Sequence, residues 1–241
     1  MKKVMFILAA VFMISQTANA QWWGGNDKIK GNGEVVTKTR SVGSYNGVSL
    51  TGSFDVELVK GKEGSIKIEA ESNLQEYITT EVKNGKLEIS TEKNVSLQTT
   101  RSVKITVPVE SIEEVSVTGS GDIYGGSTIR GEEMKLAVTG SGNLKLNLEV
   151  KEIEGKVTGS GDIDLKGKTS RLNCTVTGSG DFDARSLEAS NVDARIMGSG
   201  DIFVNVTGTL EASIAGSGDI KYSGNPDKKV KTAGSGRVSS L

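Results

Sequence analysis

The sequence predicts an all-β protein, a β-helix or β-solenoid with about 19 residues per coil that is preceded by a β-meander. The first observation is a Gly-Ser-Gly triplet that begins at positions 119, 140, 159, 178, 198, 216 and 234. The second is an alternation of apolar and polar residues on both sides of each triplet. The third is a composition of 31 Gly and 2 Pro, which suits stacked strands joined by tight corners. We therefore expect one coil per repeat, with equivalent residues stacked in columns.

Residues 1–20 are predicted to be a secretory signal peptide. Lys2 and Lys3 precede the apolar run "VMFILAAVFMI", and "ANA" at 18–20 has the small-x-small cleavage pattern. No later run reaches the roughly 18 apolar residues that a membrane-spanning helix needs. We expect an exported chain without a transmembrane segment after processing, located in the periplasm, at the outer-membrane surface or outside the cell. Residues 21–33 are expected to form a flexible N-terminus.

Residues 34–115 are predicted to form the β-meander. Period-2 alternation marks strands within 53–61, 65–72, 76–82, 84–91 and 102–109. Asn84-Gly85 is a strong signal for a two-residue hairpin turn. One helical turn is expected near Asn73–Tyr77. Because an open solenoid end would expose unpaired backbone, we expect this region to cap the stack.

Residues 116–241 are predicted to be the solenoid, continuous with the meander. In "KLAVTGSGNLKL" (135–146), every second residue is apolar or Gly, which is the pattern of a half-buried strand. If the strand stays regular through the triplet, both glycines face the interior. Their missing side chains then allow a close approach of the opposite wall, or a bend of the strand into a corner.

Charge and composition exclude several classes of function. Without Lys2 and Lys3 the chain has 27 basic against 30 acidic residues, a net charge of −3, whereas a nucleic-acid binder usually has a basic face. There is no His, which removes the commonest general base and the imidazole metal ligands. The single Cys174 cannot form an internal disulfide and shares the apolar set of its strand, so we expect a buried small hydrophobe.

Three stretches carry a family resemblance: "SYNGVSLTGSFDVELVKG", then "VKNGKLEIS", then serial copies of "VTGSGDI". Together they resemble the exported bacterial proteins described as putative auto-transporter adhesin, head GIN domain, over roughly residues 34–236. The resemblance implies a right-handed β-helix-like fold and an adhesive role. It implies no catalytic residues.

The acidic residue after each triplet has two readings. Gly-x-Gly-Asp is similar to the calcium-binding β-roll, in which stacked turns offer carboxylates and carbonyl oxygens. Alternatively, each carboxylate accepts backbone N–H bonds at its own bend, a role that Asn143 in the second copy could also fill. Either arrangement has to offset repulsion between carboxylates about 4.8 Å apart. The candidate calcium ligands are Asp122, Asp162, Asp181, Asp201 and Asp219.

The outward residues of each copy form a second candidate surface. Hydroxyls and carboxylates recur as a flat ruled face that could bind a glycan or a partner protein, or could simply be solvated. A polysaccharide-active β-helix enzyme is a third alternative, but aromatic residues are only 5% of the chain. We therefore expect a non-enzymatic envelope or surface protein with an adhesive or scaffolding role and no cofactor. The face comprises Thr118, Ser120, Asp122, Thr158, Ser160, Asp162, Thr177, Ser179 and Asp181.

Overall fold

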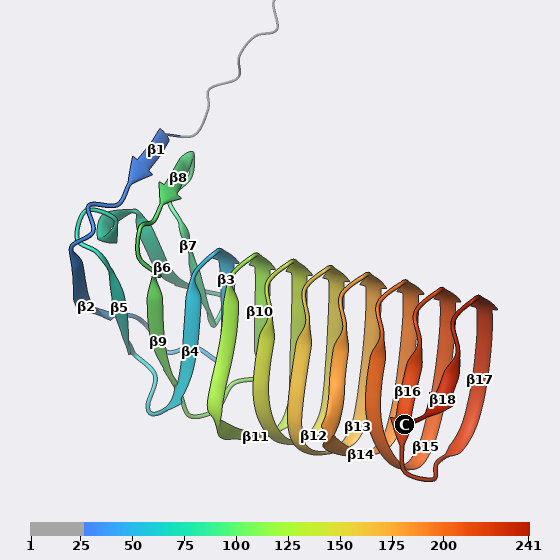
Figure 1. Cartoon of the computed structure of the whole chain (residues 1–241). Helices are drawn as coiled ribbons and strands as arrows, with labels where there is room; N and C mark the ends of the chain where they lie inside the picture. The colour runs from blue at the N-terminus through green and yellow to red at the C-terminus, as the bar shows by residue number, and fades with distance from the viewer. Residues whose placement is uncertain (1–26) are drawn as a thin grey trace, which may run out of the picture.

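The structure is a computed structural model that describes residues 27–241, so the predicted signal peptide lies outside the described residues. Strands account for 73% of the described residues, and the repeats form a β-solenoid of about seven turns with about 19 residues per coil (Figure 1). The predicted β-solenoid is confirmed. The predicted β-meander is wrong, because among the strands before the repeats only one consecutive pair, at 78–83 and 86–91, forms a hairpin, and the others pair with non-consecutive strands.

Residues 27–241 contain eighteen strands. Those before the repeats are β1 (Asp27–Lys30), β2 (Val35–Ser41), β3 (Gly47–Gly52), β4 (Asp55–Lys60), β5 (Ser65–Glu71), β6 (Ile78–Lys83), β7 (Lys86–Thr91), β8 (Val95–Gln98) and β9 (Lys104–Val109). The repeats contribute β10 (Glu114–Gly119), β11 (Asp122–Gly140), β12 (Leu144–Gly159), β13 (Ile163–Gly178), β14 (Phe182–Gly198), β15 (Ile202–Gly216), β16 (Ile220–Ser223), β17 (Asp227–Gly234) and β18 (Val238–Ser240).

Each long strand bends once and so contributes to two walls of the coil. Wall A runs in the order β6-β7-β3-β10 and continues through the C-terminal parts of β11 to β15 into β17. Wall B runs in the order β2-β5-β9-β4 and continues through the N-terminal parts of β11 to β15 into β16 and β18. The strands before the repeats therefore extend both walls of the solenoid.

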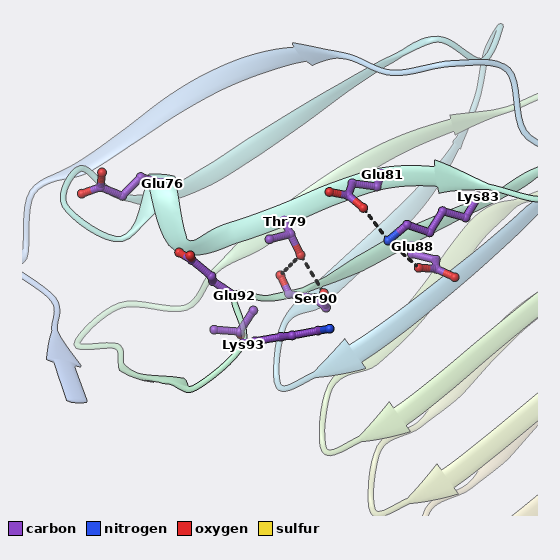
Figure 2. Close-up of a pocket in the computed structure, with 9 residues that line it drawn as sticks. Glu76, Thr79, Glu81, Lys83, Glu88, Ser90, Glu92 and Lys93 are labelled. Atoms are coloured by element: carbon purple, nitrogen blue, oxygen red, sulfur yellow. Dashed lines mark hydrogen bonds and ion pairs between the residues drawn. The ribbon is translucent and has the colours of Figure 1, made fainter. Parts of the chain in front are cut away.

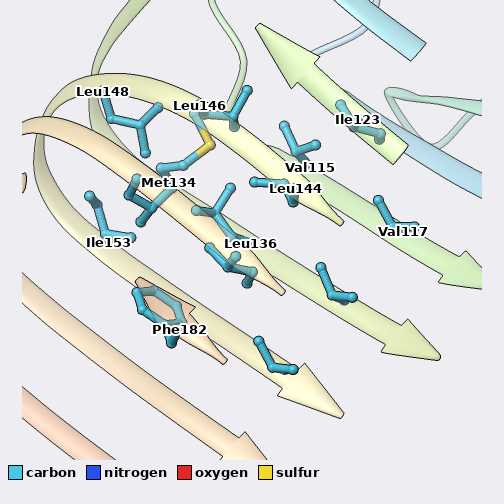
Figure 3. Close-up of a cluster of buried hydrophobic side chains, with 14 of the residues drawn as sticks. Val115, Val117, Ile123, Met134, Leu136, Leu144, Leu146, Leu148, Ile153 and Phe182 are labelled. Carbon is cyan, nitrogen blue, oxygen red and sulfur yellow. The ribbon is translucent and has the colours of Figure 1, made fainter. Parts of the chain in front are cut away.

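The core consists of inward-facing columns of apolar side chains that run across the coils (Figure 3). Every member of one such column in wall A is almost fully buried. This burial confirms the period-2 pattern, and each large apolar side chain contributes about 1.5–3 kcal/mol. The column consists of Met134, Ile153, Leu172, Val192 and Leu210.

The Gly-Ser-Gly triplet is a corner between the walls. Strand β10 ends at Gly119, and β11 begins only at Asp122. The first glycine of every triplet has φ between +115° and +147°, a conformation that other residues rarely adopt. The expectation of a regular strand through the triplet is therefore wrong, and the alternative of a bend into a corner is confirmed. Of the two glycines in each triplet only the second is buried, as at Gly142. A Cβ on Gly140 or Gly142 would instead meet the backbone of the preceding coil, at 2.5 and 2.0 Å.

Hydrogen bonds between coils explain why the corner recurs so faithfully. The Gly140 carbonyl accepts the N–H groups of both Ser160 and Gly161, at 2.8 and 3.0 Å. The same pair of bonds recurs at every later triplet. Because backbone polar groups must be paired when buried, the glycines let consecutive corners approach closely enough to satisfy them.

The region before the repeats also contains an additional coil. Strands β3 and β4 pair in register with β10 and β11, so that Gly52 aligns with Gly119 and Asp55 with Asp122. "LTGSFDV" at 50–56 is thus a degenerate copy of the repeat, with Phe54 in place of the second glycine. The hairpin at Asn84-Gly85 is confirmed, with φ of +52° and +78°. A 3-10 turn at Gln75–Tyr77 confirms the predicted helical turn.

The buried carboxylate of Glu71 binds two loop segments, one just before β2 and one just before β9. Glu71 is 0% exposed and accepts hydrogen bonds from the Gly33 N–H, the Thr100 N–H and the Thr100 hydroxyl, at 2.6 to 2.9 Å. Gly33 lies shortly after β1, and β1 pairs with β8. Both Gly33 and β1 fall within residues 21–33, the predicted flexible N-terminus. Hydrogen bonding, chiefly from the Thr100 side chain, lowers the pKa of Glu71 below its ordinary value of 4.5.

We predict that Glu71→Gln destabilises the protein at neutral pH and reduces its sensitivity to acid. A folded-state pKa below the ordinary value contributes stability above about pH 4.5, which is lost as the pH falls through the folded value. Melting temperatures of wild type and variant, measured from pH 7 to pH 3, should therefore converge on acidification. Parallel curves would contradict this role of the carboxylate.

Candidate functional site

The predicted acidic residues form one hydrogen-bonded column along the solenoid. The Asp181 N–H donates to Asp162 Oδ1 at 2.8 Å, and equivalent bonds of 2.8 to 3.2 Å recur along the column. The backbone N–H reading is supported, but each donor lies on the next coil rather than at the residue's own bend. The column consists of Asp122, Asn143, Asp162, Asp181, Asp201, Asp219 and, as its final donor, Arg237.

Cations at the two ends of this column reduce the repulsion between carboxylates. Lys221 Nζ lies 3.4 Å from Asp201 Oδ2 and 3.8 Å from Asp219 Oδ2. At the other end, burial and the Asp122 carboxylate raise the pKa of Asp55, an effect that Lys104 partly offsets. Backbone N–H donors and lysine side chains of this chain thus surround the carboxylates of the column.

We predict that Asp181→Asn leaves stability unchanged or raises it slightly, whereas Asp181→Ala costs about 1 kcal/mol. Asparagine retains the acceptor for the Asp201 N–H and removes a charge that, at about 4.8 Å, is repelled by about 0.9 kcal/mol even in bulk water. Alanine leaves that N–H without its partner. Urea denaturation of the wild type and the two variants measures the order of their free energies of unfolding.

Calcium binding by this acidic column stays a prediction. Within residues 27–241, no group of three or more His, Cys, Asp or Glu side chains is placed to hold a metal ion. Thermal melts with a chelator and with millimolar calcium test the prediction directly. A calcium-dependent rise that Asp181→Asn abolishes would show a cation site.

The predicted Thr/Ser/Asp face wraps around the corner instead of lying flat. Thr118 lies near the end of β10 in wall A, Ser120 lies in the bend, and Asp122 begins β11 in wall B. These side chains are exposed or half-buried, as expected. We call the resulting three parallel rows the corner ridge. Its threonine row is in register through Thr51, Thr118, Thr139, Thr158 and Thr177.

A polar groove over the β6–β7 hairpin was missed from the sequence (Figure 2). Its volume is about 610 Å³. The Thr79 and Ser90 hydroxyls are 2.6 Å apart, and Lys83 Nζ lies 2.5 Å from Glu81 and 3.7 Å from Glu88. Polar residues at alternate positions, Thr79, Glu81 and Lys83 on β6 and Glu88 and Ser90 on β7, were the available signal. The groove is lined by Glu76, Thr79, Glu81, Lys83, Glu88, Ser90, Thr91, Glu92 and Lys93.

Cys174 is buried, at 1% exposure, as the sequence predicted. Burial raises the pKa of its thiol well above the ordinary range, so that the reactive thiolate is strongly disfavoured. The residue acts as a small apolar side chain of the core. No helix within residues 27–241 is long and apolar enough to cross a membrane.

Comparisons with solved structures agree with this architecture. A putative adhesin from Bacteroides fragilis NCTC 9343 superimposes with a TM-score of 0.84 at 24% identity, covering 88% of this chain and 100% of its own. A putative lipid binding protein from Parabacteroides distasonis ATCC 8503 gives a TM-score of 0.75 at 26% identity, covering 89% and 100%. A putative adhesin from the same organism gives 0.74 at 25%, with the same coverage.

A search of curated proteins found no match. A family model matches residues 44–226, which span the additional first coil and most of the repeats. The chain belongs to the family described as putative auto-transporter adhesin, head GIN domain.

Proposed function

We propose that this chain is an exported, non-enzymatic protein of the cell envelope or cell surface, with an adhesive or scaffolding role exerted through the corner ridge. The observation that carries the proposal is the ridge itself, in which threonine, serine and aspartate side chains recur on successive stacked coils. Such an array offers many equivalent weak contacts along one line, and linked contacts add into avidity. The family description and its neighbours described as adhesins point the same way.

Export is tested first. The full chain, produced with residues 1–20, should appear as a processed protein in the envelope or the medium. Protease treatment of intact cells then distinguishes a surface location from a periplasmic one. Retention in the cytoplasm as an unprocessed chain would overturn the proposal of export.

Adhesion is tested with beads that carry the folded protein. The beads are presented to surfaces coated with mucin, collagen or purified bacterial polysaccharide. We expect retention on at least one surface and its loss in the variant Thr139→Lys/Thr158→Lys, which places two long charged side chains in the threonine row. The control Ser186→Lys/Ser190→Lys makes the same charge change at exposed positions outside the ridge. Equal loss in both variants, or no retention of the wild type, would contradict the proposed role.

A further inference from the structure

The regular strand ladder breaks where the first full coil meets the strands before it. Pairing of β4 with β11 stops at Leu58 and Gly125, although β4 continues along β9 to Lys60. On the other side of β11, the register with β12 shifts between Tyr124 and Thr128. Residues next to this irregularity therefore separate from β4 and leave a groove. Later coils also contain register shifts, at Asp164/Lys166 and Ala184/Glu188, but there the two strands pair again after the shift. Such irregularities in a sheet often mark functional positions.

The groove has an apolar floor and a polar rim. Leu58, Val109 and Ile129 are almost fully buried side chains that form the floor. The volume is about 390 Å³, within the range of small-molecule sites. The rim is formed by Lys60, Glu110, Ser127, Thr128 and Arg130.

The two rim cations have capacity for an anion. Lys60 forms no ion pair or side-chain hydrogen bond with any residue in 27–241. Arg130 donates only its Nε to Glu149 Oε2, at 2.8 Å, so its two terminal nitrogens remain for another acceptor. Glu110 is the one acid on the rim, and Glu149 already pairs with Arg130, so Lys60 is the rim cation without an acidic partner among residues 27–241.

We propose that this groove binds an amphiphilic carboxylate, that is, a carboxylic acid with a hydrocarbon chain of moderate length. The carboxylate lies between Lys60 and Arg130, because an arginine can bind it through paired N–H groups and a lysine adds a compact charge. The hydrocarbon chain covers Leu58, Val109 and Ile129. This site lies apart from the corner ridge and does not depend on the adhesive role.

Octanoate is the probe, with octanol and acetate as matched controls. Octanol has the same chain without the charge, and acetate has the charge without the chain. We expect octanoate, below its micelle concentration, to raise the melting temperature in a saturable manner, and the two controls to have little effect at equal concentration. Isothermal titration then gives the dissociation constant. An equal effect of octanol would mean that the floor binds apolar molecules without selecting charge, which contradicts the proposal.

Three variants assign the site. Lys60→Gln and Arg130→Gln should each weaken octanoate binding about tenfold, the loss expected for one charge-assisted hydrogen bond. Ser127→Trp should fill the groove and abolish binding, and its exposed position favours retention of the fold. Lys166→Gln, at an exposed lysine outside the groove, is the matched control and should bind as the wild type does. No thermal shift in the wild type, or unchanged binding in all three variants, would overturn the proposal.

Discussion

Gly161→Ala is expected to destabilise the protein by more than about 3 kcal/mol or to prevent folding, although it adds only one methyl group. A Cβ at this position would lie 2.0 Å from the Gly142 carbonyl oxygen and 2.8 Å from Val138 Cγ1. The oxygen belongs to the backbone of the adjacent coil, so no side-chain rotation can relieve the contact. The two coils would have to separate, and the hydrogen bonds between their corners would be lost.

Two matched variants show that the effect belongs to the corner. Gly126→Ala adds the same methyl group where a Cβ would meet nothing within 4 Å, and should change stability by no more than about 0.5 kcal/mol. Ser160→Ala changes the exposed residue of the same corner and should have an equally small effect. Urea denaturation of the purified proteins measures all three. A small, equal loss for every variant would mean that the second glycine is not needed for coil contact.

The period and the alternation predicted the solenoid because both report directly on stacking. An apolar residue at every second position can be buried only in strands, and a fixed spacing of the triplet places equivalent residues in columns. The direction of the glycines could not be predicted in the same way. Gly140 has φ of +117°, and nothing in an alternating pattern reveals that the strand ends there. The alternation of apolar and polar residues continues across the corner because the strand in wall B again places every second residue toward the interior.

The hydrogen bonds of the acidic column could also be predicted only in part from the sequence. The sequence predicted that Asp162 accepts a backbone N–H, since Asn143 stands at the equivalent position in another copy. It could not predict that the donor is the Asp181 N–H, because that depends on how consecutive coils are offset. The groove over the β6–β7 hairpin and the groove beside Leu58 lay further beyond prediction, because neither depends on a repeated motif.

The second large effect is expected inside the solenoid, where one aromatic side chain occupies space left by one glycine. The Phe182 ring lies in a column whose other members include Leu144, Ile163 and Ile202 (Figure 3). A Cβ on Gly155 would lie 2.3 Å from Phe182 Cε2. No positive φ constrains Gly155, so the aromatic ring alone explains the glycine.

Gly155→Ala alone should therefore overpack the core and cost about 1–3 kcal/mol. Phe182→Ile alone should leave a cavity beside the glycine and cost a similar amount, because replacing Phe with the smaller Ala costs about 3–5 kcal/mol. The double variant should be more stable than the sum of the two losses predicts. Two coils later, Ala194 occupies the column of Gly155 and Ile220 the column of Phe182, so that pairing of residue sizes is one the solenoid accommodates.

The coupling free energy from this double-mutant cycle should be about 1–3 kcal/mol in favour of the double variant. Urea denaturation of the four proteins measures it, and Ile163→Val, in the same column one coil earlier, serves as the control. That control should cost about 0.5–1.5 kcal/mol with or without Gly155→Ala, because the contact is specific to the aromatic ring. Strict additivity of Gly155→Ala and Phe182→Ile would mean that the ring can move aside, and that the glycine at 155 has another cause.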